Sequence, residues 1–101
     1  MPEFRKVAGT EEIASGQGKI YEVHGNSIAI CNVNGNYFAI QNMCPHRGGP
    51  VGEGEIEDGT ITCPWHGFRF DLRTGACAFN PAMKLTTYDV KVEGPDIKVG
   101  I

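Results

Sequence analysis

The chain contains no long hydrophobic run. No apolar stretch approaches the roughly 18 residues that a membrane-spanning helix requires. The first residues, Met-Pro-Glu-Phe-Arg-Lys, also lack the apolar segment of a secretory signal. We therefore expect a cytoplasmic protein that does not bind a membrane. The 101 residues are expected to form one domain, residues 1–101, and a monomer is favoured.

Positive charge is also scarce. Nine lysines and arginines stand against 12 aspartates and glutamates, which gives a net charge of −3. Nucleic-acid binding favours a basic face, so no nucleic-acid partner is expected. Mild acidity instead suits docking onto a basic patch of a redox partner. The glycine-rich stretch 48–54 is followed by neither a lysine nor a predicted helix, which disfavours a phosphate-binding loop.

Glycine, by contrast, is abundant, with 14 residues spread along the chain. Short alternating segments between turn signals predict an all-β fold, an antiparallel β-sandwich or barrel. Turns are expected at Gly25-Asn26, Asn34-Gly35 and Asp58-Gly59. A single helical turn is expected near residues 10–13, and strands at residues 4–8, 19–23, 27–33, 37–41, 60–62, 68–71, 76–79, 85–93 and 97–101.

Two of these strands carry predictions about burial. Residues 27–33 offer candidates for burial on both faces. In residues 85–93 the more apolar set, expected to face inward, is Thr86, Tyr88, Val90 and Val92. The alternate set, which begins at Leu85, is expected to face solvent.

Two short segments supply sulfur and imidazole side chains at close spacing. They are Cys44-Pro45-His46 and Cys63-Pro64-Trp65-His66, within loops expected at about 42–54 and 63–68. The prolines stiffen both turns, and the neighbouring glycines let the backbone bend closely. Two thiolates and two imidazoles suit one tetrahedral zinc ion or an iron–sulfur cluster. Zinc fingers usually pair cysteine with cysteine, whereas each segment here mixes the two ligand types.

The pattern CPHRGG…CPWHGFRFD resembles the Rieske family, in which Cys-x-His and Cys-x-x-His hold a [2Fe-2S] cluster. The resemblance implies one cluster per chain, in a small subdomain formed by the two ligand loops at one end of the β-structure. It also implies that Cys44 and Cys63 bind the inner iron and that His46 and His66 bind the outer one. The two histidine edges would then mark the docking site for partners. A loop at residues 80–83 would form a third wall over the cluster.

Charge decides the chemistry that such a cluster would supply. Two ferric ions, two sulfides and two thiolates sum to zero, so reduction creates one negative charge. An all-cysteine cluster is already negative, which is why the Rieske potential is higher, at roughly −150 to +300 mV. Because reduction makes the imidazoles more basic, the potential is expected to fall with pH at alkaline values.

Neighbouring positions favour the low end of that range. In membrane-anchored members of the family, each ligand loop carries an extra cysteine, and hydroxyl groups donate to the cluster sulfurs. The corresponding positions here are Gly49 and Trp65 for the cysteines, and Phe68 and Phe70 for the hydroxyls. Fewer donors stabilise the reduced state less, so a low potential is expected.

The resemblance implies an electron carrier that performs no substrate chemistry itself. It is similar to ferredoxins that pass electrons from an NAD(P)H-dependent flavoprotein reductase to a terminal oxygenase. One alternative is the small subunit of an assimilatory nitrite reductase, and another is a zinc-stabilised interaction module. Outside the motif, Cys31 and Cys77 are expected to be buried free thiols. His24 is expected to be a solvated loop residue.

Overall fold

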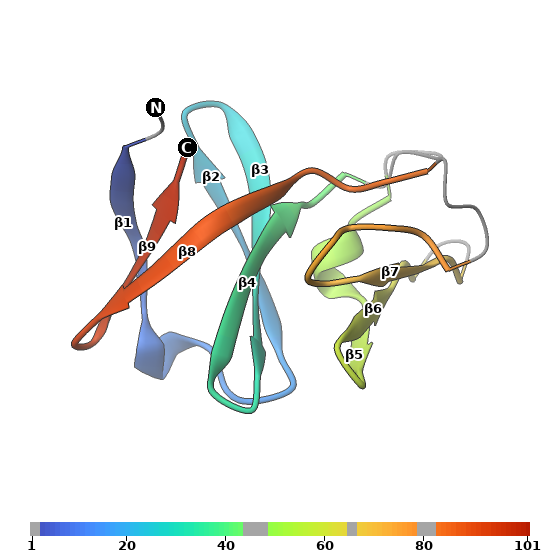
Figure 1. The fold of residues 1–101 in the computed structure, drawn as a ribbon, viewed down its shortest axis with the longest axis horizontal. Coiled ribbons are helices and arrows are strands. Elements are labelled where there is room, and N and C mark those ends of the chain that lie inside the picture. Colours follow the sequence, from blue (N-terminus) through green and yellow to red (C-terminus); the bar gives the residue numbers. More distant parts are fainter. Residues whose placement is uncertain (1–2, 44–48, 65–66, 79–82) are drawn as a thin grey trace.

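The structure is a computed structural model that describes residues 3–43, 49–64, 67–78 and 83–101. The larger of its two sheets is antiparallel and curls into a nearly closed barrel (Figure 1). The order of its strands is β1-β9-β8-β4-β3-β2. The strands are β1 (Phe4–Gly9), β2 (Gly18–Val23), β3 (Asn26–Val33), β4 (Asn36–Gln41), β8 (Thr87–Glu93) and β9 (Asp96–Gly100). A 3-10 turn, η1 (Thr10–Glu12), follows β1 at the predicted place.

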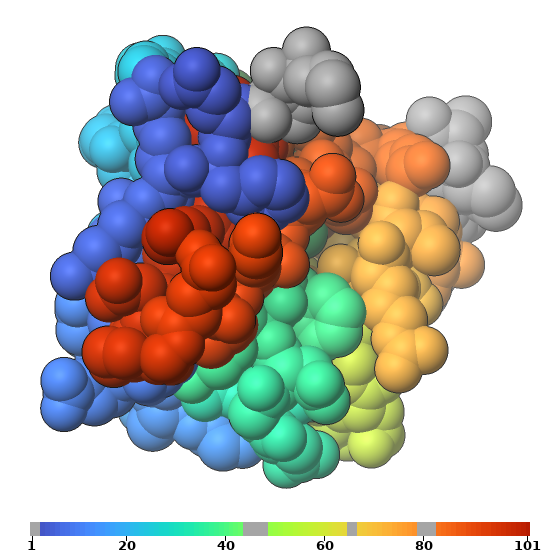
Figure 2. Space-filling view, turned by 60° about the vertical axis from the view of Figure 1, so that its left-hand side comes forward, coloured from blue at the N-terminus to red at the C-terminus, as the bar shows by residue number. Residues whose placement is uncertain are grey.

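A second, smaller sheet lies beside the barrel. It consists of β5 (Glu55–Glu57), β6 (Thr60–Thr62) and β7 (Arg69–Asp71), in that order, and a 3-10 turn, η2 (Val51–Glu53), precedes it. Figure 1 shows this sheet on one side of the large one, with both ends of the chain on the opposite side. In Figure 2 the red surface of the last two strands lies between the blue of β1 and the green of β4, as the strand order requires. Within the described residues, no helix is long and apolar enough to cross a membrane.

Three tight turns set the registers of both sheets. Asn34-Gly35 has φ values of 52° and 88°, and Asp58-Gly59 has 51° and 75°. Positive φ at both central residues suits the twist of a two-residue hairpin, so these two predictions are confirmed. The turn predicted at Gly25-Asn26 lies one residue earlier, at His24-Gly25. Asn26 already pairs with Val23 as the first residue of β3.

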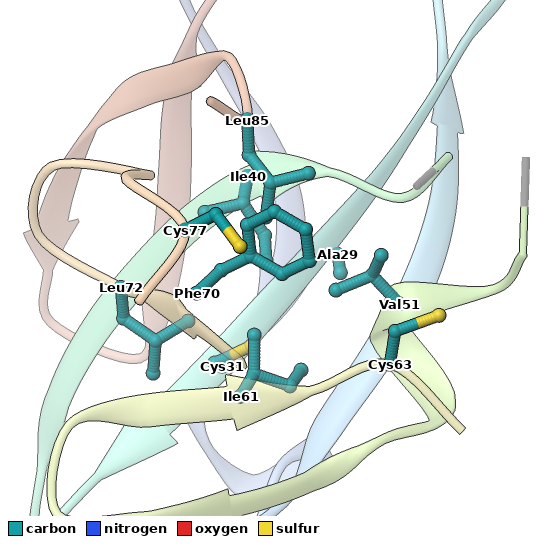
Figure 3. Close-up of a cluster of buried hydrophobic side chains, with 10 residues drawn as sticks. All are labelled: Ala29, Cys31, Ile40, Val51, Ile61, Cys63, Phe70, Leu72, Cys77 and Leu85. Atoms are coloured by element: carbon teal, nitrogen blue, oxygen red, sulfur yellow. The ribbon is translucent and has the colours of Figure 1, made fainter. Parts of the chain in front are cut away.

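Both faces of β3 are buried, as predicted. Ile28 and Ile30 face the barrel interior, in a core that also contains Ala8, Ile13, Ala39, Ile97 and Val99. Ala29 and Cys31 belong to a second core that covers the outer face of the strand (Figure 3). The other members of that second core are Ile40, Val51, Ile61, Cys63, Phe70, Leu72, Cys77 and Leu85. The second core therefore fastens the small sheet to the barrel.

The cysteines outside the motif belong to this second core. Cys31 and Cys77 are buried free thiols, as predicted, and no disulfide joins them. Burial raises the pKa of the Cys31 thiol to about 12, so this side chain stays protonated and acts as a small apolar group. His24 is exposed in its turn, also as predicted.

Two predictions near the C-terminus were wrong in part. Leu85 is buried rather than solvent-facing, because it precedes β8 and packs in the second core. Tyr88 and Val90 do face the barrel core, but Thr86 is exposed and Val92 is 45% exposed. Val92 lies beyond β4, which pairs with β8 only at residues 87 and 88. The strand expected at residues 76–79 is reduced to isolated bridges at Ala76 and Cys77, and residue 79 lies outside the described residues.

The buried side chain of Asn32 ties the barrel to the segment after β1. Its Nδ2 donates to the Ile13 carbonyl at 2.9 Å, and its Oδ1 accepts from the Gly35 N–H at 2.8 Å. Asn32 as a whole residue is only 6% exposed, so water cannot easily replace these hydrogen bonds. Asn32 is therefore a buried polar group whose amide is satisfied at both ends.

We expect Asn32→Ala to destabilise the protein by about 1–3 kcal/mol, because the Ile13 carbonyl and the Gly35 N–H lose their partner. Urea denaturation followed by circular dichroism measures this change. Asn36→Ala, at an exposed position of the same hairpin, is the control and should cost less than about 0.5 kcal/mol. Equal effects of the two substitutions would contradict this account of Asn32.

Candidate metal-cluster site

One of the four candidate ligands lies within the described part of the chain. Cys63 directly follows β6, is fully buried and is a free thiol. Figure 3 shows it at the margin of the second core, with its sulfur pointing away from the other labelled side chains. Cys44, His46 and His66 lie outside the described residues.

A short backbone loop holds Cys63 in place between β6 and β7. The Cys63 N–H donates to the Phe68 carbonyl at 2.8 Å, and the Gly67 N–H donates to the Cys63 carbonyl at 2.9 Å. Gly67 has a φ of 72°, a left-handed conformation that glycine adopts without strain. The two bonds close the loop at its root, so the position of Cys63 is fixed by the small sheet.

The first ligand loop is closed at its root by Asn42. The Asn42 carbonyl accepts from the Val51 N–H at 2.8 Å, and its side-chain Oδ1 accepts from the Gly52 N–H at 2.9 Å. Asn42 Nδ2 donates to Ser27 Oγ at 3.1 Å, which anchors the root to β3. Both ends of the segment 43–50 are thus held next to the barrel.

The two roots adjoin each other. Val51, at the end of the first loop, and Cys63, at the start of the second, belong to the same core (Figure 3). Glu55 pairs with Thr62, the residue before Cys63, and Gly54 lies so close to the Thr62 carbonyl that a Cβ would overlap it. The fold therefore brings the described ends of both predicted ligand loops together.

A third segment approaches the same end of the small sheet. The Cys77 N–H donates to the Met83 carbonyl at 3.0 Å, and the Ala78 N–H donates to the Arg69 carbonyl at 2.8 Å. Met83 is half-buried against the second core. Residues 80–82, predicted to form a third wall over the cluster, lie outside the described residues.

The surroundings of Cys63 are apolar on one side and acidic on the other. An open cavity of about 310 Å³ borders Cys63 and reaches Glu53 and Glu55, both exposed. Negative charge near a redox centre disfavours the addition of an electron, although solvent screens exposed carboxylates. The two carboxylates therefore favour a lower reduction potential, as the sequence also predicts.

The described residues fit an iron–sulfur cluster. A thiolate ligand must be a cysteine outside any disulfide, and Cys63 meets that condition. Its burial among Val51, Ile61 and Phe70 suits the inner position that the family resemblance implies for it. The chain thus offers one described sulfur donor on a rigid hairpin, next to the root of the loop that carries Cys44 and His46.

Comparison with protein families and relatives identifies the family of the chain. The family model for the Rieske [2Fe-2S] domain matches residues 3–89. The chain is 35% identical to the ferredoxin component of biphenyl 2,3-dioxygenase from Rhodococcus jostii, over 95% of this chain and 91% of the relative.

Solved structures extend the comparison. The ferredoxin of carbazole 1,9a-dioxygenase from Nocardioides aromaticivorans has a TM-score of 0.89 and 30% identity, and the match covers 96% of each chain. A chain in a complex of oxygenase and ferredoxin of carbazole 1,9a-dioxygenase has a TM-score of 0.86 and 25% identity, over 96% of this chain and 92% of that one. A putative nitrite reductase small subunit from Mycobacterium tuberculosis has a TM-score of 0.93, and the match covers 100% of this chain and 96% of that one. Its identity is only 19%, so that likeness concerns the fold alone.

Sequence reasoning missed the residues that fix the loop roots. Asn42 and Gly52 were treated only as members of the first loop, yet their contacts hold that loop on the barrel. The available signal was an amide side chain two positions before the first ligand. Amides at the end of a strand often bond to neighbouring backbone, but the partner cannot be identified without the fold.

We expect Gly52→Ala to destabilise the protein by about 1–3 kcal/mol, as overpacking does. Its Cβ would lie 2.7 Å from Ile20 Cγ1, 2.8 Å from Ala29 Cβ and 2.9 Å from Asn42 Oδ1. Gly9→Ala is the matched control, because its Cβ would lie 3.2 Å from Glu12 Oε2 and 3.7 Å from the Pro95 carbonyl, with no closer contact, and its φ is an ordinary −99°. Urea midpoints of the two variants compare the effects, and a Gly52→Ala midpoint equal to that of Gly9→Ala would contradict the close packing.

Proposed function

Because the chain belongs to the Rieske [2Fe-2S] domain family, we propose that it is the ferredoxin of an oxygenase system. In this role it carries single electrons from an NAD(P)H-dependent flavoprotein reductase to a terminal oxygenase. The observation that carries the proposal is the 35% identity to a dioxygenase ferredoxin component over nearly the whole of both chains. The bound cluster supplies the chemistry, which is to accept one electron and release it again.

We assign the four ligands to two irons. Cys44 and Cys63 hold the inner iron, and His46 and His66 hold the outer one. The burial of Cys63 and the closeness of the two loop roots support this assignment. The free thiols of Cys31 and Cys77 take no part in ligation. Both are buried, Cys31 within a strand and Cys77 in an isolated bridge to Phe70.

The relatives support the acceptor, and the chemistry of electron transfer supports the donor. A ferredoxin similar to this chain occurs in a complex with the oxygenase of carbazole 1,9a-dioxygenase, which supports an oxygenase as acceptor. A flavoprotein reductase is the donor because NAD(P)H delivers electrons in pairs, whereas a [2Fe-2S] cluster accepts one at a time. We place the protein in the cytoplasm, where free thiols such as Cys31 persist.

The nitrite reductase alternative receives less support. Its structural relative shares the fold at only 19% identity, whereas the three ferredoxin relatives named above are 25%, 30% and 35% identical to this chain. A zinc-stabilised module does not agree with the family, whose members bind a [2Fe-2S] cluster. The ferredoxin function is therefore preferred.

The ligand assignment predicts that Cys63→Ser loses the cluster, since a hydroxyl is a poorer ligand for cluster iron than a thiolate. Cys31→Ala and Cys77→Ala are matched controls at two other buried cysteines. Both controls should retain the iron and acid-labile sulfide of one cluster per chain. Chemical iron and sulfide analysis of the purified variants measures this. Retention of the full cluster by Cys63→Ser would remove Cys63 from the ligand set.

The proposed function is tested by electron delivery. The holo-protein should have a potential near the low end of the family range, about −150 mV. NADH and the flavoprotein reductase of a dioxygenase system should then bleach its visible absorption, and a terminal oxygenase should restore the colour. The Cys63→Ser protein is the control and should carry no electrons. A potential well above zero, or a holo-protein that no such reductase reduces, would contradict this function.

A further inference from the structure

The side chain of Gln41, the last residue of β4, joins two backbone segments that are far apart in the sequence. Its Nε2 donates to the Met43 carbonyl at 2.6 Å, and its Oε1 accepts from the Thr86 N–H at 2.7 Å. The orientation of the amide is fixed by its partners, because a carbonyl can only accept and an N–H can only donate. The backbone N–H of Gln41 also donates to the Thr86 carbonyl at 2.8 Å.

Both partners lie at the roots of segments described above. Met43 is the last described residue before the first ligand loop, and Thr86 follows the third segment, which runs from Cys77 to Leu85. The Gln41 side chain therefore joins Met43 to the third segment, in addition to the backbone bond between Gln41 and Thr86. Met43 is 61% exposed, so its packing does little to hold the root in place.

The remaining ties between the three segments involve backbone atoms. Pairing of β5 with β6 joins the root of the first loop to that of the second. The hydrogen bond from Ala78 to Arg69 joins the second loop to the third segment. Between the third segment and the first loop, the described hydrogen bonds are the backbone bond from Gln41 to Thr86 and the two bonds of the Gln41 side chain, which alone reach Met43.

We propose that Gln41 is a positioning residue for the cluster, which it influences through Met43 and Thr86 without being a ligand. This inference rests on the proposed function, because it requires a [2Fe-2S] cluster between the loops. Without the amide, the Met43 carbonyl and the Thr86 N–H lose their partner, and only the backbone bond from Gln41 to the Thr86 carbonyl still ties the first loop to the third segment. Water then reaches the cluster more easily.

Solvent access changes two measurable properties of the cluster. Reduction takes a neutral cluster to a single negative charge, and water stabilises the charged form more than the neutral one. A more exposed cluster therefore has a more positive potential. Its iron is also released faster, because the ligands are held in place less firmly.

The test compares Gln41→Met with Gln17→Met in the holo-protein. Methionine has about the length of glutamine and neither donates nor accepts these bonds, and Gln17 is exposed in the bend before β2. We expect Gln41→Met to lose its cluster to a chelator about tenfold faster, as two lost hydrogen bonds imply. Its potential should shift to a more positive value, whereas both properties of Gln17→Met should equal those of the unsubstituted protein.

A second substitution covers the case in which Gln41→Met does not fold. Gln41→Glu keeps an acceptor for the Thr86 N–H but places a carboxylate opposite the Met43 carbonyl, so its cluster loss at neutral pH should also exceed that of Gln17→Met. An unchanged potential in a folded Gln41→Met protein would overturn the proposal, as would cluster loss from Gln41→Glu at the rate of the control. If the unsubstituted protein itself contains no [2Fe-2S] cluster, the proposed function fails instead, and iron analysis distinguishes the two results.

Discussion

Burial of both faces of β3 is the constraint on which the rest of the structure depends. Its even-numbered residues close the barrel, and its odd-numbered residues receive the small sheet. The contact between the odd-numbered face of β3 and η2, called the seam below, is built from small residues. A Cβ at Gly18 would lie 3.2 Å from both Cys31 Sγ and the Gly52 carbonyl, and one at Gly52 would lie 2.8 Å from Ala29 Cβ. Larger residues there would separate η2 from the barrel, and the root of the first ligand loop would move with it.

The site inherits its rigidity from this seam and not from regular structure of its own. Each of the three segments near Cys63 is closed at its root by backbone hydrogen bonds within about 3 Å, at Asn42, at Cys63 and at Cys77. Side-chain amides then fix the roots to the barrel and to one another. A loop that must bend around a cofactor can hold its shape in this way without forming a strand or a helix.

Much of the fold could be predicted from the sequence, because its signals are local. Asn-Gly and Asp-Gly turns set the hairpins, and alternation identified most strands. The errors concern residues whose environment is decided by distant parts of the chain. Leu85 is buried because it packs in the second core, although the alternation of β8 placed it on the solvent face. Val92 is exposed because β4 ends before it could pair with this part of β8. Cys63 was predicted as a ligand from residue type and spacing, which are also local signals. The contacts of Asn42 and Gln41 could not be predicted in this way, because Thr86, a partner of the Gln41 side chain, lies 45 residues further along the chain.

Pairing of the first and last strands has a further consequence. Phe4 is the partner of Gly100, so the two ends of the domain lie next to each other, away from the small sheet (Figure 1). A domain with adjacent ends can be inserted into a longer polypeptide through short linkers without distortion. The same geometry would let this domain be tethered at either end to an electrode or a fused enzyme while the cluster end stays accessible.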